Sequence, residues 1–320
     1  MRTARVILSV ISAVAACACN IDGVIESPVG DDELNRRPDT PSSSIHVTKV
    51  FEYTPAPGQF INNTIVGGFD GSETTPEAAA AYAMRRMNEG GYVSLGAFGG
   101  YIIAGFDHSI ENDGDYNIAI TGNSFDSNSE PGIVYVMRDE NGNGLPDDTW
   151  YELKGSEYGK SETLRDYSVT YYRPEGDNQP VRWSDSLGGE GEIDVMRLHR
   201  QASYYPAWIE EDSYTLTGIR LAARNYQNEN GTWTNAPFEW GYADNFSPID
   251  RLTDDDNAAG LASTNHFKIS DAVDENGSPA GLKFIDFVKV QCALNTKSGA
   301  LGECSTEVIR ISDYNLIKRL

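Results

Sequence analysis

An acidic segment near the middle of the chain has the residue types and the spacing of a cation site. In residues 139–148, oxygen-bearing side chains occupy relative positions 1, 3, 5, 9 and 10, and Gly144 at position 6 permits a tight turn. Calcium takes six to eight hard oxygen ligands, and this spacing lets one segment wrap around a single ion. We therefore predict a structural Ca²⁺ site formed by Asp139, Asn141, Asn143, Leu145, Asp147 and Asp148.

This segment differs from an EF-hand, because position 12 is Trp150 rather than Glu and no helices are expected to flank it. The alternative is a hydrated hairpin turn, for which Asn-Gly is also the preferred sequence. A bound ion would hold the loop rigid in front of the strand expected at 149–154.

Two groups of aromatic residues, in 203–209 and 238–245, have the composition of a ligand-binding surface. Aromatic rings give flat ligands, sugars or macrocycles a large contact area at a low cost in entropy. The alternative is that these rings pack in the core. The residues that we predict to bind a ligand are Tyr204, Tyr205, Trp208, Trp240, Tyr242 and Asp244.

Sequence patterns for catalysis are weak. The chain contains no Gly-x-Ser-x-Gly, His-Glu-x-x-His or phosphate-binding loop. Asp107 and His108 have the chemistry of a general base, but without a nucleophile motif nearby we expect a structural histidine. A glycosidase needs two facing carboxylates, and nothing in the sequence singles out such a pair among 48 acidic residues. A function without catalysis is therefore favoured, and enzymatic activity is left open.

The first residues and the cysteines indicate the compartment. Arg2 and Arg5 precede an apolar run that ends at Cys17, which is the pattern of a bacterial lipoprotein signal. We predict that Cys17 is lipidated, with Cys19 as the alternative, so that the protein contacts the membrane only through this anchor. Cys292 and Cys304 are predicted to form a disulfide across a short loop, the alternative being two free thiols.

The charge balance excludes two classes of partner. The 320 residues include 48 Asp or Glu and 25 Lys or Arg, for a formal net charge of −23. Nucleic acid binding needs a basic surface that neutralises phosphate, and attraction to anionic lipid needs a polybasic patch. Neither nucleic acid nor an anionic lipid surface is therefore an expected partner of a chain with this acidic composition.

Most of the secondary structure elements that position these residues are expected to be β-strands. One helix is expected from Pro76 to Met87, with Thr75 as its N-cap. The fold class that we predict is all-β, a large jelly-roll-like β-sandwich with one short helix. The expected domains are a signal peptide at 1–16, a flexible tether at 17–44 and a β-sandwich at 45–320. The expected strands are 47–53, 92–95, 100–107, 116–122, 132–138, 149–154, 166–172, 181–183, 214–221, 238–242, 267–269, 284–292 and 307–311.

Several runs together resemble a family of cell-surface lipoproteins from Bacteroidota, whose longer members carry PKD-type modules in front. These runs are 53–60, 93–100, 105–108, 130–134, 139–152, 155–158, 203–206, 240–245, 285–290 and 301–308. The resemblance covers nearly all of residues 47–313. It implies a lipid-anchored protein of the outer membrane that is exposed on the cell surface, from genes often found beside outer-membrane transporter genes, including those for cobalamin uptake.

The resemblance therefore favours ligand capture for a TonB-dependent transporter. A corrinoid such as vitamin B12 is the first ligand that we expect, because wide aromatic faces suit a macrocycle, and a glycan is the second. The alternatives are a glycan-binding or polysaccharide-hydrolysing surface protein, and a calcium-stiffened structural or adhesion module without a small ligand.

Overall fold

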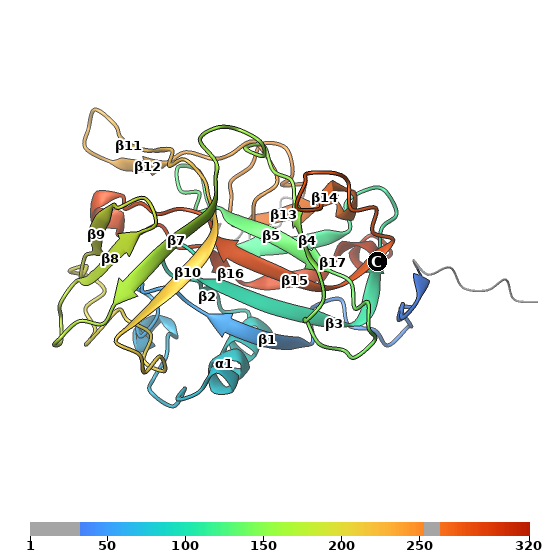
Figure 1. Ribbon diagram of the computed structural model, residues 1–320, viewed down its shortest axis with the longest axis horizontal. Helices are drawn as coiled ribbons and strands as arrows, with labels where there is room; N and C mark the ends of the chain where they lie inside the picture. The colour runs from blue at the N-terminus through green and yellow to red at the C-terminus, as the bar shows by residue number, and fades with distance from the viewer. Residues whose placement is uncertain (1–32, 253–262) are drawn as a thin grey trace, which may run out of the picture.

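The computed structural model describes residues 33–252 and 263–320 as a mainly β protein (Figure 1). The expected signal peptide, the lipidation residue Cys17 and the first half of the tether lie outside the described residues. Within the described ranges, no helix is long and apolar enough to cross a membrane.

Five sheets, all with antiparallel pairing between neighbouring strands, make up the described body. The six-stranded sheet has the order β1 (Lys49–Thr54), β3 (Tyr101–Glu111), β15 (Phe284–Cys292), β5 (Gly132–Met137), β6 (Trp150–Leu153) and β14 (Ala272–Val273). The four-stranded sheet has the order β10 (Ser213–Arg220), β7 (Leu164–Tyr172), β8 (Val181–Asp185) and β9 (Glu190–Ile193).

The smaller sheets and the helices complete the body. A three-stranded sheet has the order β13 (Ser263–Phe267), β4 (Ile118–Gly122) and β17 (Arg310–Asp313). Two-stranded sheets join β11 (Asn225–Gln227) to β12 (Trp233–Asn235), and β16 (Glu307–Val308) to β2 (Val93–Ser94). The helices are α1 (Pro76–Asn88) and α2 (Tyr314–Ile317), with 3₁₀ turns η2 (Thr64–Val66), η3 (Ile269–Asp271) and η4 (Gly299–Leu301).

The mainly β class predicted from the turn-marked strands is confirmed, with two short helices rather than one. The strand expected at 284–292 has the bounds of β15. Jelly-roll connectivity is a finer statement than the sheet order, and it stays a prediction.

The strand expected at 238–242 does not form, and the hairpin β11–β12 lies just before it instead. Gly241 and Asp244 have φ angles of +88° and +54°, which are incompatible with an extended strand. The segment folds back on itself, because Asn245 Oδ1 accepts from the Phe238 N–H at 2.9 Å and Asn245 Nδ2 donates to the Phe238 carbonyl at 2.9 Å. A positive φ at a non-glycine residue leaves no periodic signal in a sequence, which explains the error.

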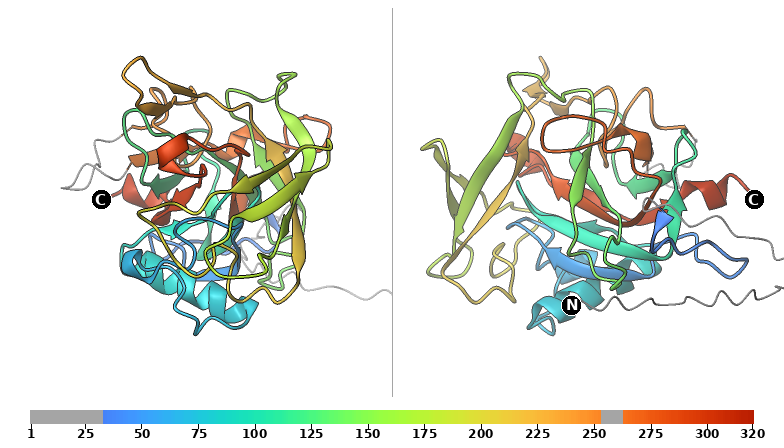
Figure 2. Two further views of the ribbon diagram at one scale, coloured as in Figure 1. Left: turned by 90° about the vertical axis from the view of Figure 1, so that its left-hand side faces the viewer. Right: turned by 45° about the vertical axis from the view of Figure 1, so that its right-hand side comes forward.

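Helix α1 follows its sequence signals. Thr75 caps it by accepting from the Ala78 N–H at 3.2 Å, and Pro76 occupies the first helical position. Its buried side packs beside β1, as Figure 2 shows, and the Tyr82 ring stacks 6.1 Å from the Tyr53 ring of that strand. The helix thus covers one side of the six-stranded sheet near its β1 edge.

The four-stranded sheet stands at one end of the six-stranded sheet (Figure 1). Gln291, near the end of β15, connects the two by donating through Nε2 to the Thr217 carbonyl of β10 at 3.1 Å. Beneath the four-stranded sheet lies a second hydrophobic cluster that is rich in aromatic side chains. Its fully buried rings are Phe98, Tyr167, Tyr171, Tyr204 and Tyr205.

The folded body begins before residue 45, where the tether was expected to end. Arg37 donates to the Asp286 carboxylate through Nη2 at 2.9 Å, and its backbone carbonyl accepts from the Ser109 N–H at 2.7 Å. Asp39 pairs with Arg319 at 2.6 Å. These long-range contacts tie the end of the expected tether to the body, so the domain boundary lies earlier in the chain.

His108 is a structural residue that links β3 to the end of β17. Its Nδ1 lies 2.7 Å from Asp107 Oδ1, its Nε2 lies 2.8 Å from Asp313 Oδ2, and the ring is buried. Burial lowers the pKa of His108, but hydrogen bonds to Asp313 and Asp107 outweigh it, so the pKa lies above its ordinary value.

We expect His108→Ala to lower the free energy of unfolding by about 3 kcal/mol, because it removes two charge-assisted hydrogen bonds from a buried position. Since the folded-state pKa is raised, this contribution is fully present below the unfolded pKa of His and is lost as the pH rises through the folded value. Urea unfolding across pH 5 to 9 measures both effects. His46→Ala, which removes one contact to Ser312 at 2.8 Å, is the control and should cost about 1 kcal/mol. A His108 variant as stable as the control would contradict this role.

Candidate functional site

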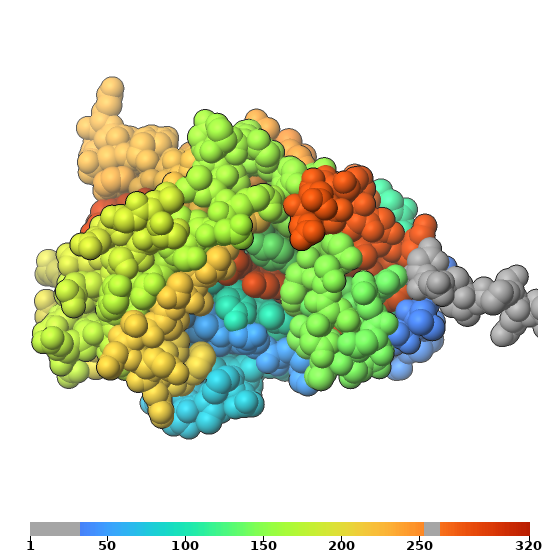
Figure 3. All heavy atoms as spheres, in the orientation of Figure 1, coloured from blue at the N-terminus to red at the C-terminus, as the bar shows by residue number. Residues whose placement is uncertain are grey.

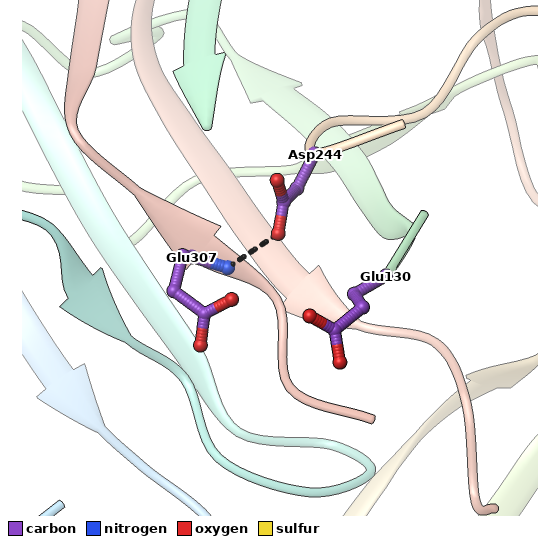
Figure 4. Close-up of side chains that lie close together, drawn as sticks. All are labelled: Glu130, Asp244 and Glu307. Atoms are coloured by element: carbon purple, nitrogen blue, oxygen red, sulfur yellow. Dashed lines mark hydrogen bonds between the residues drawn. The ribbon is translucent and has the colours of Figure 1, made fainter. Parts of the chain in front are cut away.

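Three carboxylates from distant parts of the chain meet inside the protein. Glu130 lies just before β5, Asp244 lies in the loop after β12, and Glu307 begins β16. One oxygen of each lies within 4.8 Å of the others, and Figure 4 shows the three side chains converging. We call these three residues the acid cluster. Oxygen groups in this arrangement have the geometry to hold a metal ion.

Asp244 is the centre of this cluster and is completely buried. Its Oδ1 accepts from the backbone N–H groups of Asn123 and Ser124, both at 2.8 Å, and its Oδ2 accepts from the Glu307 N–H at 2.8 Å (Figure 4). A methyl group at Gly122 would collide with the Asp244 carboxylate. The sequence therefore needs a glycine at the end of β4 so that the loop carrying Asp244 can approach this closely.

The other two carboxylates are held by the segment that leads into β16. Glu130 Oε1 accepts from the Ser305 N–H at 3.1 Å, and Glu307 Oε1 accepts from Ser305 Oγ at 2.9 Å. The Asn123 side-chain amide also reaches the cluster, 3.3 Å from Asp244 Oδ1 and 3.2 Å from Glu307 Oε2. Its NH₂ group could donate to both carboxylates, whereas its oxygen could serve with them as a fourth ligand of an ion.

Burial makes the charged form of these carboxylates unfavourable. It raises the pKa of Glu130 to about 8, with the charge of Asp244 as the next cause, and it raises the pKa of Asp244 to about 7. The pKa of Glu307 lies well above its ordinary value because of burial and the charges of Glu130 and Asp244. Within the described residues, none of the three forms an ion pair with a Lys, Arg or His. A bound cation would compensate the negative charge of the cluster, and bound protons would do so in the absence of a cation.

The segment predicted to bind calcium, 139–148, forms an exposed loop (green in Figure 3) that is closed by its own hydrogen bonds. Asp139 Oδ1 accepts from the Asn143 N–H at 3.1 Å, and Asp139 Oδ2 accepts from the Gly144 N–H at 2.9 Å. Asn141 Nδ2 donates to Asp147 Oδ1 at 3.0 Å and to Asp148 Oδ1 at 3.2 Å. The expected ligands do lie near one another, and calcium at this loop stays a prediction.

The aromatic residues predicted to bind a ligand do not form one surface. Tyr204 and Tyr205 are buried in the cluster beneath the four-stranded sheet, and Tyr242 is buried in another cluster. Their hydroxyls are used internally: Tyr205 donates to the Glu211 carbonyl at 2.8 Å. Asp244 belongs to the acid cluster. Packing between sheets explains this outcome, because such rings bury a large apolar area.

The two tryptophans of that prediction are only partly buried. Trp208 packs against both large hydrophobic clusters, and its Nε1 has no hydrogen-bond partner among the described residues. Trp240 lines a cavity of about 250 Å³ together with Lys154 and Asp250, and none of the other five predicted residues lines that cavity. The structure thus separates the residues that the sequence grouped together.

The predicted disulfide is absent, and Cys292 and Cys304 are two separate buried thiols. Cys292 packs in the main hydrophobic cluster and Cys304 packs in a smaller one. The Cys292 thiol lies 3.6 Å from the Cys304 carbonyl oxygen. The two cysteines are therefore neighbours in the fold, but their sulfurs are not bonded.

A cleft of about 580 Å³ opens beside β8 and β9. These two strands form the outer hairpin of the four-stranded sheet (Figure 1). The residues 295–303 form its opposite wall. Trp183 of β8 and the buried residue Glu303 both line it. Sequence reasoning missed this cleft, because its walls come from segments about 110 residues apart.

Glu130 and Glu307 were also missed, although a signal for them existed. Each lies in one of the runs on which the family resemblance rests, 130–134 and 301–308, as Asp244 lies in 240–245. Comparison of the chain with family models gives no match, and comparison with curated proteins gives none. The resemblance therefore stays a prediction, and function has to be argued from the sites themselves.

Proposed function

We propose that this protein is anchored to the outer membrane through a lipid on Cys17 and binds a small ligand on the cell surface for uptake by a TonB-dependent transporter. The observation that carries the proposal is the cleft between the β8–β9 hairpin and residues 295–303, whose walls combine an aromatic ring with polar groups. Binding sites for small molecules are concave and have this mixed lining. A corrinoid is the first ligand to test, and a glycan is the second.

Calcium is the ion that we propose for the acid cluster. Every group that converges there offers oxygen, and hard oxygen ligands favour Ca²⁺ or Mg²⁺ over metals that prefer nitrogen or sulfur. Magnesium demands near-ideal octahedral geometry and keeps several waters, whereas calcium accepts irregular sets of carboxylates. A second calcium ion in the loop 139–148 completes the proposal. Both ions act structurally, because they connect segments of the body that carries the cleft.

Titration of the purified chain with a ligand panel tests the binding function. The panel contains cyanocobalamin, cobinamide, neutral oligosaccharides and an oligogalacturonate, and isothermal titration calorimetry measures each affinity. We expect micromolar or tighter binding of at least one member, since a cleft of this size buries most of a small ligand. Absence of binding across the whole panel would contradict ligand capture and favour the structural or adhesion module.

A further inference from the structure

We infer that the cleft beside β8 and β9 binds an uncharged saccharide, with the Trp183 ring packed on one face of a sugar and Glu303 hydrogen-bonded to a sugar hydroxyl. This inference rests on the proposed binding function and gives its ligand class. It differs from the site expected from the sequence, whose tyrosines are buried in the core.

The first step is the position of Trp183. It pairs with Gly191 across the β8–β9 hairpin, and a methyl group at Gly191 would collide with the indole ring. The ring therefore lies over a residue without a side chain, at the outer edge of the sheet, and lines the cleft. An aromatic ring at such an edge presents a flat apolar surface of the kind that fits the C–H face of a sugar.

The second step is Glu303 on the opposite wall. Its Oε1 accepts from the Gln59 N–H at 2.6 Å, while its Oε2 has no hydrogen-bond partner among the described residues. The side chain is buried, with 4% of the residue exposed. A buried polar atom without a partner is costly, and a ligand hydroxyl in the cleft would satisfy it. Burial raises the pKa of Glu303 to about 8, so the neutral acid prevails at pH 7 and can donate this bond.

The third step is the charge of the walls. Glu190, Glu192 and Arg182 line the cleft, and their side chains make no hydrogen bond or ion pair to another described residue. Asp194 is neutralised by Lys297 at 2.6 Å. The cleft is thus slightly acidic overall, which disfavours anionic ligands, while its many polar groups suit a ligand rich in hydroxyls.

The test uses the full mature chain and neutral oligosaccharides of glucose, xylose, mannose and galactose, with oligogalacturonate and cyanocobalamin as comparisons. We expect a neutral oligosaccharide to bind, Trp183→Ala to weaken binding about thirtyfold, and Glu303→Ala to weaken it about tenfold. Glu303→Gln should bind nearly as well as wild type, because an amide replaces the neutral acid. Trp150→Ala, which changes a partly buried tryptophan of β6 that does not line the cleft, is the matched control and should change nothing.

Several results would overturn the inference. They are equal binding by wild type and Trp183→Ala, preferential binding of oligogalacturonate, or loss of binding in Trp150→Ala. Binding of cyanocobalamin that is independent of Trp183 would overturn it while leaving ligand capture intact. If no panel member binds, both the saccharide inference and the proposed ligand-capture function are contradicted. Melting curves of each variant separate lost contacts from lost folding. If Trp183→Ala unfolds, the difference of about tenfold in affinity expected between Glu303→Ala and Glu303→Gln still tests the inference.

Discussion

Removal of divalent cations is expected to lower the melting temperature of this protein by about 10 °C. A ligand present at about a thousand times its Kd stabilises the folded state by about 4 kcal/mol, and each kcal/mol shifts the melting temperature of a domain this large by about 2–4 °C. The physical reason is the acid cluster, since three carboxylates lie close together, with Asp244 and Glu307 buried and Glu130 half-buried. Differential scanning fluorimetry with and without EDTA, followed by added CaCl₂, measures the effect and its reversal.

The effect of the chelator should grow with pH. In the cation-free protein, the folded-state pKa values of the cluster are raised, to about 8 for Glu130 and about 7 for Asp244. Raised carboxyl pKa values mean that the folded protein binds more protons than the unfolded chain from about pH 4 to pH 8, so stability falls as the pH rises through this window. Calcium replaces those protons. Stability with EDTA should therefore drop between pH 5 and pH 8, and stability with calcium should not.

A variant separates the acid cluster from the exposed loop. Glu307→Gln removes one charge while keeping the size of the side chain, and its new amide can donate to the Asn123 oxygen. We expect it to fold and to lose most of its response to EDTA. Asp147→Asn in the loop 139–148 is the matched control and should keep the larger part of that response. An unchanged response in Glu307→Gln would contradict a cation at the cluster.

Asp286→Ala is expected to cost about 3–5 kcal/mol of folding free energy, which is the cost of breaking a buried ion pair from one side. Asp286 is completely buried and binds three segments at once. Its Oδ1 accepts from Arg37 Nη2 at 2.9 Å and from Ser109 Oγ at 2.6 Å, and its Oδ2 accepts from the Asp139 N–H at 2.9 Å. The substitution leaves all three donors without their acceptor, and urea unfolding measures the loss.

The same substitution should also disturb the acidic loop, because Asp139 is its first residue. The control is Asp39→Ala, which removes the Asp39–Arg319 pair at the protein surface and should cost about 1 kcal/mol or less. A cost for Asp286→Ala as small as that of the control would show that Arg37 and the loop are held by other contacts.

The sequence allowed the fold class to be predicted because local patterns determine strands and caps. Alternating apolar residues mark β1, and the Thr75-Pro76 pair marks the start of α1. The region 238–245 was misread as a strand, because its fold depends on a positive φ at Asp244 and on side-chain bonds from Asn245. Such tertiary contacts leave no periodicity in the sequence.

The acid cluster could be predicted only in part. We selected Asp244 as a site residue from the sequence, but we grouped it with its aromatic neighbours. The role expected for it was ligand binding, not cation binding. Glu130 and Glu307 lie 114 and 63 residues away from it in the chain, so no spacing rule connects them. Only the packing of β5, β16 and the loop after β12 brings the three together.

Aromatic composition alone did not distinguish a ligand surface from a core. Tyr204 and Tyr205 stand beside a turn proline, as surface residues often do, yet both are fully buried. Trp183 lies in a short strand with no aromatic neighbour beside it in the sequence, and it lines the cleft of about 580 Å³. Exposure depends on which sheet edge a strand occupies, and that is a property of the assembled fold.

Calcium stoichiometry tests the central claim, that the acid cluster holds a cation, most directly. Equilibrium dialysis of the chelated mature chain against calcium, with metal measured by mass spectrometry, is compared for wild type, Glu307→Gln and Asp147→Asn. We predict two bound ions in wild type and one in each variant, and we expect the melting temperature to fall with the ion lost from Glu307→Gln. Equal calcium in wild type and Glu307→Gln, with no change in melting temperature on chelation, would contradict it.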